Sequence, residues 1–500
     1  MSIGDTFKKG SIWTIGMIVV GMGLTYLRNL CLSHADPTGY LMGAISIAFV
    51  YVNLILNFGS LGCVMMLTKF LPEIGNPADR FKLTTTSILI QVPLAAISMG
   101  ILLWLPPEYT GKLGLSIVSK YPEWILVLTI FTLLASWIGS VLPGIMKFGA
   151  NAKVTVITPL SLFVVSVAAL AFPDTVRNNI FPIVFSCLIF AAITMFAYTL
   201  WIAKNDLKPV WGFYTPKGYF SAYFWFTAFG IISFAAMNLS QLFVSSYLGL
   251  EALGIYFLFQ QIAMLSNLAV QKLSAPMLAT FSKILKDEGE SENSRLSAVY
   301  QKLCRKMNII SFLSVIAFIS FNKLIGLIFG QTFAEHSYVL IILSLGLCMA
   351  NTNNILQQII FAKGWIAANV CVFIIVSTAY FGMLYFTIHE YRLVSASVGY
   401  SLYCVLRYVL MLSYIYAKTK DIDFFQKSSY WYSLIITLPL GIFFLFVKTD
   451  LFLIPATVSI VASLLYLKLI HFKITEIFEI LPKSAVQKAE YVFAKLGLYK

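Results

Sequence analysis

The sequence has few charged residues. Asp, Glu, Lys and Arg make up 11% of its 500 residues, whereas an average soluble domain has about 25%. Hydrophobic residues reach 59%. Because a soluble fold needs far more polar surface, this composition excludes a soluble protein and predicts an integral membrane protein.

Motifs for catalysis, nucleotide hydrolysis and metal binding are also absent. There is no Walker A motif and no HExxH pair, the four histidines lie near span ends or in loops, and the seven cysteines include no CxxC pair. The longest external loop, 106–123, offers Glu108 and Glu123 without a partner for acid–base work. We therefore expect neither an enzyme nor a metal or cofactor. Without a basic domain or base-stacking module, nucleic acid is not expected as a partner.

Long apolar segments fill most of the chain. A hydrocarbon core about 30 Å thick needs about 20 apolar residues per helical span. Fourteen segments meet this requirement: 11–31, 43–67, 83–105, 124–144, 154–172, 180–203, 220–247, 253–275, 307–330, 337–361, 367–387, 394–417, 430–448 and 452–470. The prediction is an all-α membrane protein with about fourteen transmembrane helices, and the first segment is expected to be a span rather than a cleaved signal peptide.

The 35 Lys and Arg residues predict the orientation. With the N-terminus in the cytoplasm, 27 of them lie in cytoplasmic segments, five on the opposite face and three (Arg28, Lys323 and Arg407) within spans. Positive residues concentrate on the cytoplasmic side of membrane proteins, so both termini are predicted to be cytoplasmic. This topology also explains the net charge of +14, and the cytoplasmic basic residues are expected to contact membrane lipids.

An internal repeat divides the chain. The hinge Asp36-Pro-Thr-Gly39-Tyr40 after the first span matches Glu251-Ala-Leu-Gly254-Ile-Tyr256 after the seventh at an offset of 215 residues. A repeat that begins after six spans keeps its orientation and is typical of transporters. We predict an N-terminal lobe (1–203), a cytoplasmic linker (204–219), a C-terminal lobe (220–417) with a cytoplasmic loop (282–306), two further spans (418–470) and an amphipathic cytoplasmic tail (471–500).

Charges inside the membrane are costly and point to a cavity, a partner or an interface. Arg407, near the middle of span twelve, is predicted to face a cavity or a buried partner. Arg28, one turn inside the outer end of span one, fits either an interfacial position or a cationic lining for an anionic substrate. Lys69 and Lys272, near the cytoplasmic ends of spans two and eight, fit either membrane anchoring or substrate contact.

No Asp or Glu lies in the middle of a span, which argues against a carboxylate site for organic cations. Neutral amides are abundant instead. The candidates for substrate binding are Asn53, Asn57, Asn238, Gln241, Gln260 and Asn354. Such groups can bind sugar hydroxyls or bond neighbouring helices, and the sequence leaves both interpretations open. Asp36, followed by Pro37, fits a helix N-cap with Pro at the first helical position, and Asp36 and Glu251 are also candidates for gating.

Several motifs together resemble a known family. They are Arg28-Asn-Leu with Asp36-Pro-Thr-Gly-Tyr40, Asn57-Phe-Gly-Ser-Leu-Gly62, Lys69-Phe-Leu-Pro-Glu73, Tyr247-Leu-Gly-Leu-Glu-Ala-Leu-Gly-Ile-Tyr256 and Leu324-Ile-Gly-Leu-Ile-Phe-Gly330. This pattern resembles polysaccharide flippases of the multidrug, oligosaccharidyl-lipid and polysaccharide exporter superfamily, including O-antigen repeat-unit flippases. The resemblance implies two pseudo-symmetric six-helix lobes in a V, with two extra C-terminal helices that would form a groove for a polyprenyl tail. It also implies alternating access and a cationic residue in the first helices, here Arg28 and less securely Lys69, that binds a lipid pyrophosphate.

The resulting functional hypothesis is a flippase that moves a polyprenyl-pyrophosphate-linked oligosaccharide across a bacterial inner membrane. The alternatives are a lipid II flippase, a multidrug cation antiporter of the same superfamily, and a membrane-embedded glycosyltransferase or polymerase. No cofactor is expected, and coupling to a Na⁺ or H⁺ gradient or to the membrane potential stays open. A polysaccharide polymerase and export machinery are the expected protein partners.

Overall fold

The computed structural model confirms the all-α class. It describes residues 3–470 except 61, 72–73, 105–107, 109–119, 146, 266, 268–276, 278–280, 282–291, 420–428 and 447–452, and all regular structure in these residues is helical. Apolar segments fold this way because the hydrocarbon offers no partner for a free backbone N–H or C=O, and a helix satisfies both within the segment.

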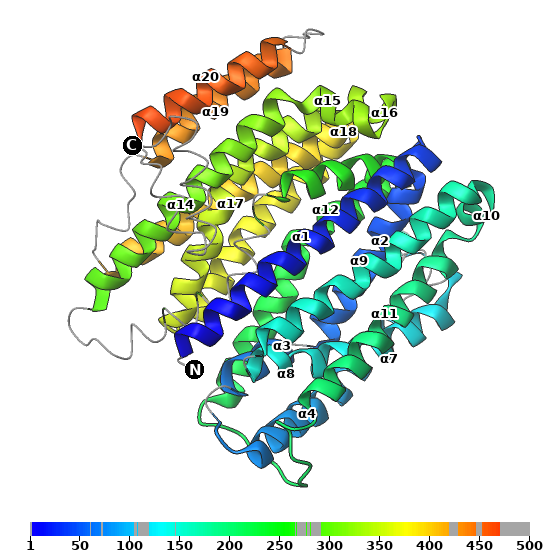
Figure 1. The fold of residues 1–500 in the computed structure, drawn as a ribbon, viewed down its shortest axis with the longest axis vertical. Coiled ribbons are helices and arrows are strands. Elements are labelled where there is room, and N and C mark those ends of the chain that lie inside the picture. The colour runs from blue at the N-terminus through cyan, green and yellow to red at the C-terminus, as the bar shows by residue number, and fades with distance from the viewer. Residues whose placement is uncertain are drawn as a thin grey trace, which may run out of the picture.

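The first group of helices runs to residue 203. It comprises α1 (Ile3–Ala35), α2 (Tyr40–Leu54), η1 (Ile55–Gly59), α3 (Cys63–Phe70), α4 (Pro77–Trp104), α7 (Pro122–Gly139), α8 (Val141–Gly144), α9 (Phe148–Ala171), α10 (Pro173–Asn178) and α11 (Ile180–Ala203). Here α1 packs along α9, and α11 packs against both α9 and α7 (Figure 1).

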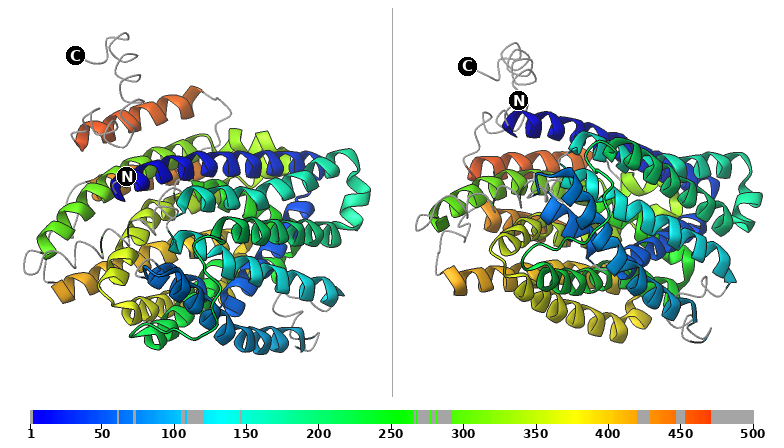
Figure 2. Two further views of the ribbon diagram at one scale, coloured as in Figure 1. Left: turned by 60° about the horizontal axis from the view of Figure 1, so that its bottom comes forward. Right: turned by 90° about the horizontal axis from the view of Figure 1, so that it is seen from below.

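The second group follows a non-helical connection, 204–218. It comprises α12 (Tyr219–Ala263), α14 (Glu292–Ser320), α15 (Asn322–Phe329), α16 (Gln331–Glu335), α17 (Tyr338–Ala362), α18 (Ile366–Thr419), α19 (Ser429–Phe446) and α20 (Leu453–Leu469). In this group α17 packs against α14 and α18, and α19 and α20 pack on α14. Two further views show α20 at the edge of the bundle (Figure 2).

Helix α12 is a hairpin rather than a straight rod. Gly249 inside it has φ 89° and ψ 174°, and a 2.8 Å hydrogen bond joins Gln241 and Gln260 on either side. In a straight helix these residues, 19 positions apart, would be separated by about 28 Å. The bond therefore shows that α12 has two antiparallel arms, which we call the first arm (219–248) and the second arm (250–263).

Helix α18 reverses in the same way at Arg392, which has φ 47° and ψ −124°. The rings of Tyr380 and Tyr403, on opposite sides of this point, lie 5.9 Å apart. Each hairpin thus contains two of the predicted spans. Eight helical stretches in the described residues, including the two hairpins, are long and apolar enough to cross a membrane, and 435–445 and 454–469 are shorter apolar helices. The chain is a multi-pass membrane protein, while the count of fourteen spans stays a prediction.

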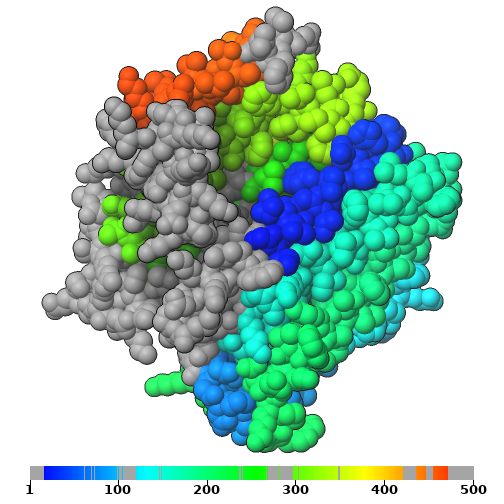
Figure 3. Space-filling model, in the orientation of Figure 1, coloured from blue at the N-terminus to red at the C-terminus, as the bar shows by residue number. Residues whose placement is uncertain are grey.

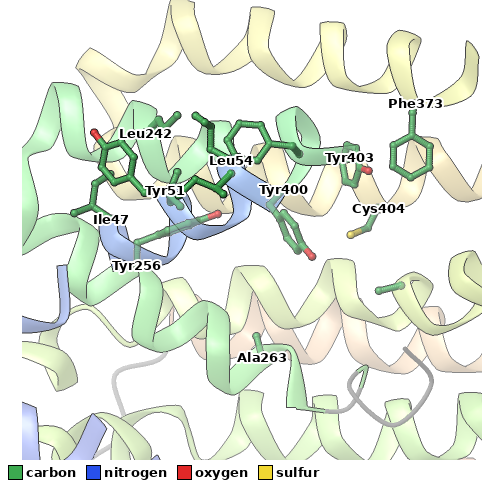
Figure 4. Packing of buried hydrophobic residues seen from close by; sticks show 14 of the residues in the cluster. Ile47, Tyr51, Leu54, Leu242, Tyr256, Ala263, Phe373, Tyr400, Tyr403 and Cys404 are labelled. Atoms are coloured by element: carbon green, nitrogen blue, oxygen red, sulfur yellow. The ribbon is translucent and has the colours of Figure 1, made fainter. Parts of the chain in front are cut away.

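One apolar cluster joins the two groups. In Figure 4 its members come from α2, α12 and α18: Ile47, Tyr51, Leu54, Leu242, Tyr256, Ala263, Phe373, Tyr400, Tyr403 and Cys404. Helix α2 packs along α12 over much of its length. In the space-filling view, α1 forms a strip at the surface between the α9–α11 side and the α14–α17 side (Figure 3). The contact between α2 and α12 is therefore the main seam between the two groups.

A second, smaller cluster fastens α20 to α14. The rings of Phe312 and Tyr466 stack at 3.7 Å, and Arg305 donates a 3.0 Å hydrogen bond to the carbonyl oxygen of Ile470. Helix α20 is thus attached through α14, whereas α19 packs on both α14 and α17.

Candidate functional site

A cavity of about 310 Å³ lies at the seam between α2–η1 and the two arms of α12. The described residues that line it are Phe49, Asn53, Asn57, Ser233, Phe234, Asn238, Gln241, Phe257, Gln260, Gln261 and Met264. Five of the ten predicted substrate-binding residues are in this wall. The structure therefore brings together amides that are about 200 residues apart in the sequence.

One wall of the cavity is a single face of α2 and η1. Phe49, Asn53 and Asn57 recur every four residues, so they lie along one face of α2 and its continuation. Asn57 belongs to η1, a single π-helical turn at Ile55–Gly59. Such turns often mark functional sites because the widened turn moves a side chain out of the regular helical register.

Amide hydrogen bonds cross the seam at the Asn53 level. Asn53 Nδ2 donates to Asn238 Oδ1 at 2.9 Å, Asn238 Nδ2 donates to the Phe234 carbonyl oxygen at 3.1 Å, and Asn57 Nδ2 donates to the Asn53 carbonyl oxygen at 2.7 Å. One N–H of each side-chain amide is thus used within the protein, which orients the amides, and the Oδ1 atoms of Asn53 and Asn57 accept no hydrogen bond from another described residue.

A second chain of polar groups lies nearer the hinges. Ser46 donates to Gln241 Oε1 at 3.3 Å, and Gln241 Nε2 donates to Gln260 Oε1 at 2.8 Å. These contacts link α2 with both arms of α12. The interpretation that these amides bond neighbouring helices is confirmed, and the same side chains line the cavity, while sugar binding stays a prediction.

Sequence reasoning missed part of the wall. Phe49, Phe257 and Gln261 were not predicted, although the spacing of Phe49 to Asn53 could have identified the first of them. Tyr26 of α1 donates a 3.1 Å hydrogen bond to the Gln261 carbonyl oxygen, which ties α1 to the second arm of α12 beside the cavity. This contact joins positions 235 residues apart and has no local sequence pattern.

Arg28 does not line the cavity. Its side chain is 1% exposed, its Nε and Nη2 donate to Asn29 Oδ1 at 3.1 and 2.8 Å, and its guanidinium lies 5.6 Å from the centre of the Phe49 ring. Since Phe49 is part of the cavity wall, the positive charge stands directly behind that wall. The interfacial interpretation is wrong for this residue, because a snorkelling side chain would be exposed.

Arg407 and Asn354 also lie outside the wall. Arg407 Nη2 donates to Gln357 Oε1, and its guanidinium lies 4.3 Å from the centre of the Phe373 ring. Asn354 Nδ2 donates to Asn267 Oδ1 at 2.8 Å. Arg407 thus has a hydrogen-bond partner within α17 and α18 rather than at the seam, and both it and Gln357 are partly buried. Lys272 and the side chain of Lys69 lie outside the described residues.

The two repeated hinges meet at one end of the seam. A Cβ atom built on Gly254 would lie 2.0 Å from the Gly39 carbonyl oxygen, and one on Gly43 would lie 1.9 Å from the Leu250 carbonyl oxygen. Ordinary contacts of a Cβ begin at 3.4 Å. The backbones therefore touch at a distance that only glycine allows, and they close the seam at this end.

Asp36 organises this hinge. Its Oδ2 accepts a 2.8 Å hydrogen bond from the Leu41 backbone N–H, and its Oδ1 accepts a 2.7 Å bond from Thr38 Oγ1. The prediction that Pro37 opens the helix is wrong: α2 starts at Tyr40 after Gly39, whose φ of 85° makes a turn first. Arg177 Nη1 lies 3.8 Å from Asp36 Oδ1. Glu251, the other acidic residue predicted at the hinges, is exposed.

The described lining residues carry no ionisable side chain, and the wall alternates amides with aromatic rings. Among the described residues no group of three His, Cys, Asp or Glu side chains could hold a metal ion. Chemically, the site can bind an uncharged polar group by hydrogen bonds and an apolar face by ring contact.

Comparison with known proteins identifies the family. A family model described as "Polysaccharide biosynthesis protein" matches residues 42–338, which is more than half of the chain. The chain belongs to the polysaccharide biosynthesis protein family. It is 26% identical to the capsular polysaccharide biosynthesis protein CapF of Staphylococcus aureus over 184 residues, which are 36% of this chain and 44% of that relative, so the match spans less than half of CapF.

Solved transporters share the fold of this family member. The lipid II flippase MurJ in an inward closed conformation matches with a TM-score of 0.61 at 16% identity, covering 91% of this chain and 97% of MurJ. A transporter of the MOP superfamily (the exporter superfamily named above) from Pyrococcus furiosus matches with 0.58 at 16%, covering 83% and 97%. A MATE transporter matches with 0.59 at 13%, covering 83% and 97%. The chain therefore shares its fold with solved transporters, as the resemblance predicted.

Proposed function

We propose that the protein is a flippase that moves a polyprenyl-pyrophosphate-linked oligosaccharide across the inner membrane of a bacterium. The observation that carries the proposal is the cavity of amides and aromatic rings between α2 and α12. It supports a substrate whose inserted part is rich in hydroxyl groups. The family membership supports the same class, since its description concerns polysaccharide biosynthesis.

The mechanism that we propose is alternating access between two lobes, one on each side of the seam. We propose 1–203 and 220–417 as these lobes. The glycine contact between the two hinges holds α2 against the second arm of α12 at one end of the seam in this conformation. With both termini in the cytoplasm, the hinges lie at the outer face. The structure would then represent a state closed to the outside, and export would require the hinges to separate.

Arg28 is proposed to offset the pyrophosphate charge from behind Phe49. A buried guanidinium polarises its surroundings strongly, since the interior screens charge poorly. Arg407 is proposed to offset charge in the second lobe, and Asp36 and Glu251 to support the gate. Lys69 and Lys272 remain proposed contacts at the cytoplasmic entrance. The cavity wall argues against a cation antiporter, because the described lining residues include no carboxylate.

The test is transport by purified protein in liposomes, with a fluorescent lipid-linked oligosaccharide that a glycosidase can reach only in the outer leaflet. Faster exposure than in protein-free liposomes is expected, and no difference would refute the proposal. Transfer of sugar by the purified protein would indicate a glycosyltransferase instead. Imposing a Na⁺ gradient, an H⁺ gradient or a membrane potential in turn identifies the coupling.

Complementation of a flippase-deficient strain tests the two arginines. Arg28→Ala and Arg407→Ala are expected to abolish polysaccharide export while the protein stays in the membrane at normal levels. Lys323→Ala is the matched control, since Lys323 is the third basic residue within the predicted spans. Full complementation by both arginine variants would contradict their roles.

A further inference from the structure

The free polar atoms of the cavity are distributed unevenly. The amide network uses one of the two N–H groups of Asn53 and of Asn57, and their Oδ1 atoms make no hydrogen bond to another described residue. Gln260 is the reverse case. Its Oε1 accepts a hydrogen bond from Gln241, and its Nε2 makes no hydrogen bond to another described residue. The Asn53–Asn57 end of the cavity therefore presents two unused oxygen acceptors, and the other end presents the unused Gln260 Nε2 donor beside the side-chain amide of Gln261.

Two aromatic rings lie at the donor end. The Phe49 and Phe257 rings are stacked with centroids 6.4 Å apart and an angle of 28° between their planes, and both line the cavity. The face of an aromatic ring carries negative charge and attracts the weakly positive C–H groups of a saturated ring. Together, the rings and the amides match a molecule with an apolar face and hydroxyl or acetamido groups at its edge.

An acidic group would be poorly placed at the acceptor end. A carboxylate or phosphate there would face the Asn53 and Asn57 oxygen atoms, and no described lining residue could pair with its charge. The nearby cation, Arg28, stands behind Phe49. Because Phe49 and Asn57 are eight residues apart, they are separated by about 12 Å along the helix axis. Burying an unpaired charge in a membrane protein is far more costly than burying a hydroxyl group that is hydrogen-bonded.

We infer that the cavity takes uncharged sugar units and rejects acidic ones at the Asn53–Asn57 end. Hydroxyl or acetamido N–H groups of the sugar donate to the Oδ1 atoms of Asn53 and Asn57, and Gln260 Nε2 donates to a sugar oxygen. The C–H face of the ring lies against Phe49 and Phe257, which leaves the pyrophosphate outside the amide end. This inference rests on the proposed function and specifies which saccharides the flippase accepts.

The test uses two synthetic polyprenyl-pyrophosphate disaccharides that differ only in the terminal sugar, glucose in one and glucuronic acid in the other. Each is assayed with the full-length protein in liposomes, where the glucose compound is expected to move at least about tenfold faster. Equal rates, or faster movement of the glucuronic acid compound, would overturn the cavity assignment and leave the flippase proposal standing. If neither compound moves, the proposed function itself is refuted.

A cation placed in the cavity should change this selectivity. Asn57→Lys puts a positive charge at the acceptor end and is expected to raise the rate ratio of the acidic to the neutral compound at least about tenfold. Asn205→Lys, in the exposed connection between the two groups of helices, adds the same charge outside the cavity and should leave the ratio unchanged. An equal effect of both variants would show that net charge, not the cavity, sets the preference. The wild-type comparison remains decisive even if Asn57→Lys does not fold.

Discussion

The glycine contact between the hinges makes a sharp prediction about conformational equilibrium. In the Gly254→Ala variant, the new methyl carbon would lie 2.0 Å from the Gly39 carbonyl oxygen, whereas ordinary contact begins at 3.4 Å. The hinges must therefore separate by about 1.4 Å in that direction. Because the obstructing atom belongs to the backbone, it cannot rotate away as a side chain would.

Overpacking of this kind typically costs about 1–3 kcal/mol. The penalty applies only to the state in which the hinges touch, so the equilibrium should shift toward the state with separated hinges by a factor of about 5–150. Gly43→Ala, with its methyl carbon 1.9 Å from the Leu250 carbonyl oxygen, should have the same effect. The two changes should be less than additive, because either one separates the same pair of backbones.

Spin labels at Thr38 and Ser246, both exposed near the hinges, can measure this shift in a background whose native cysteines are replaced. We expect Gly254→Ala to increase the population of long distances and to slow transport. Gly100→Ala is the matched control, since nothing lies within 4 Å of its added carbon. An unchanged distance distribution in correctly inserted Gly254→Ala protein would refute the assignment of this contact as the gate.

Three further predictions concern the seam, the buried cation and the C-terminal helices. Asn53→Ala and Asn238→Ala should each slow transport, and their double-mutant cycle for unfolding should show a coupling of about 0.6 kcal/mol, typical of hydrogen bonds between membrane helices; strictly additive effects would contradict a direct bond. Arg28→Gln should raise the substrate concentration for half-maximal transport more than it lowers the maximal rate, and Arg28→Lys should restore part of the affinity; a pure loss of maximal rate would argue for a role in conformational change instead. Phe312→Ala removes the ring stacked on Tyr466 and should destabilise the protein by about 3–5 kcal/mol, measured as a lower thermal midpoint in detergent, while transport by the folded fraction persists; unchanged stability would show that α20 is held by other contacts.

The sequence by itself determined the membrane class, the helical fold and the positions of most spans. These follow from composition and from the length of apolar runs, because the bilayer allows few alternatives to a helix. It also identified five of the eleven residues of the cavity wall, from Asn53 and Asn57 on one helix face to Gln260 far along the chain. The resemblance in the hinge motifs indicated a protein of polysaccharide biosynthesis, and the family match established membership of that family.

The tertiary structure alone decided which side chains meet. An apolar span buries almost any face equally well, so its sequence does not say toward which neighbour Arg28 or Arg407 turns. Packing directs the first onto Asn29 and Phe49 and the second onto Gln357, away from the cavity wall. The reversal of α12 at Gly249 likewise places Gln260 opposite Gln241. Local propensity decides that a segment is helical, but only the contacts between distant helices decide which of its faces becomes the site.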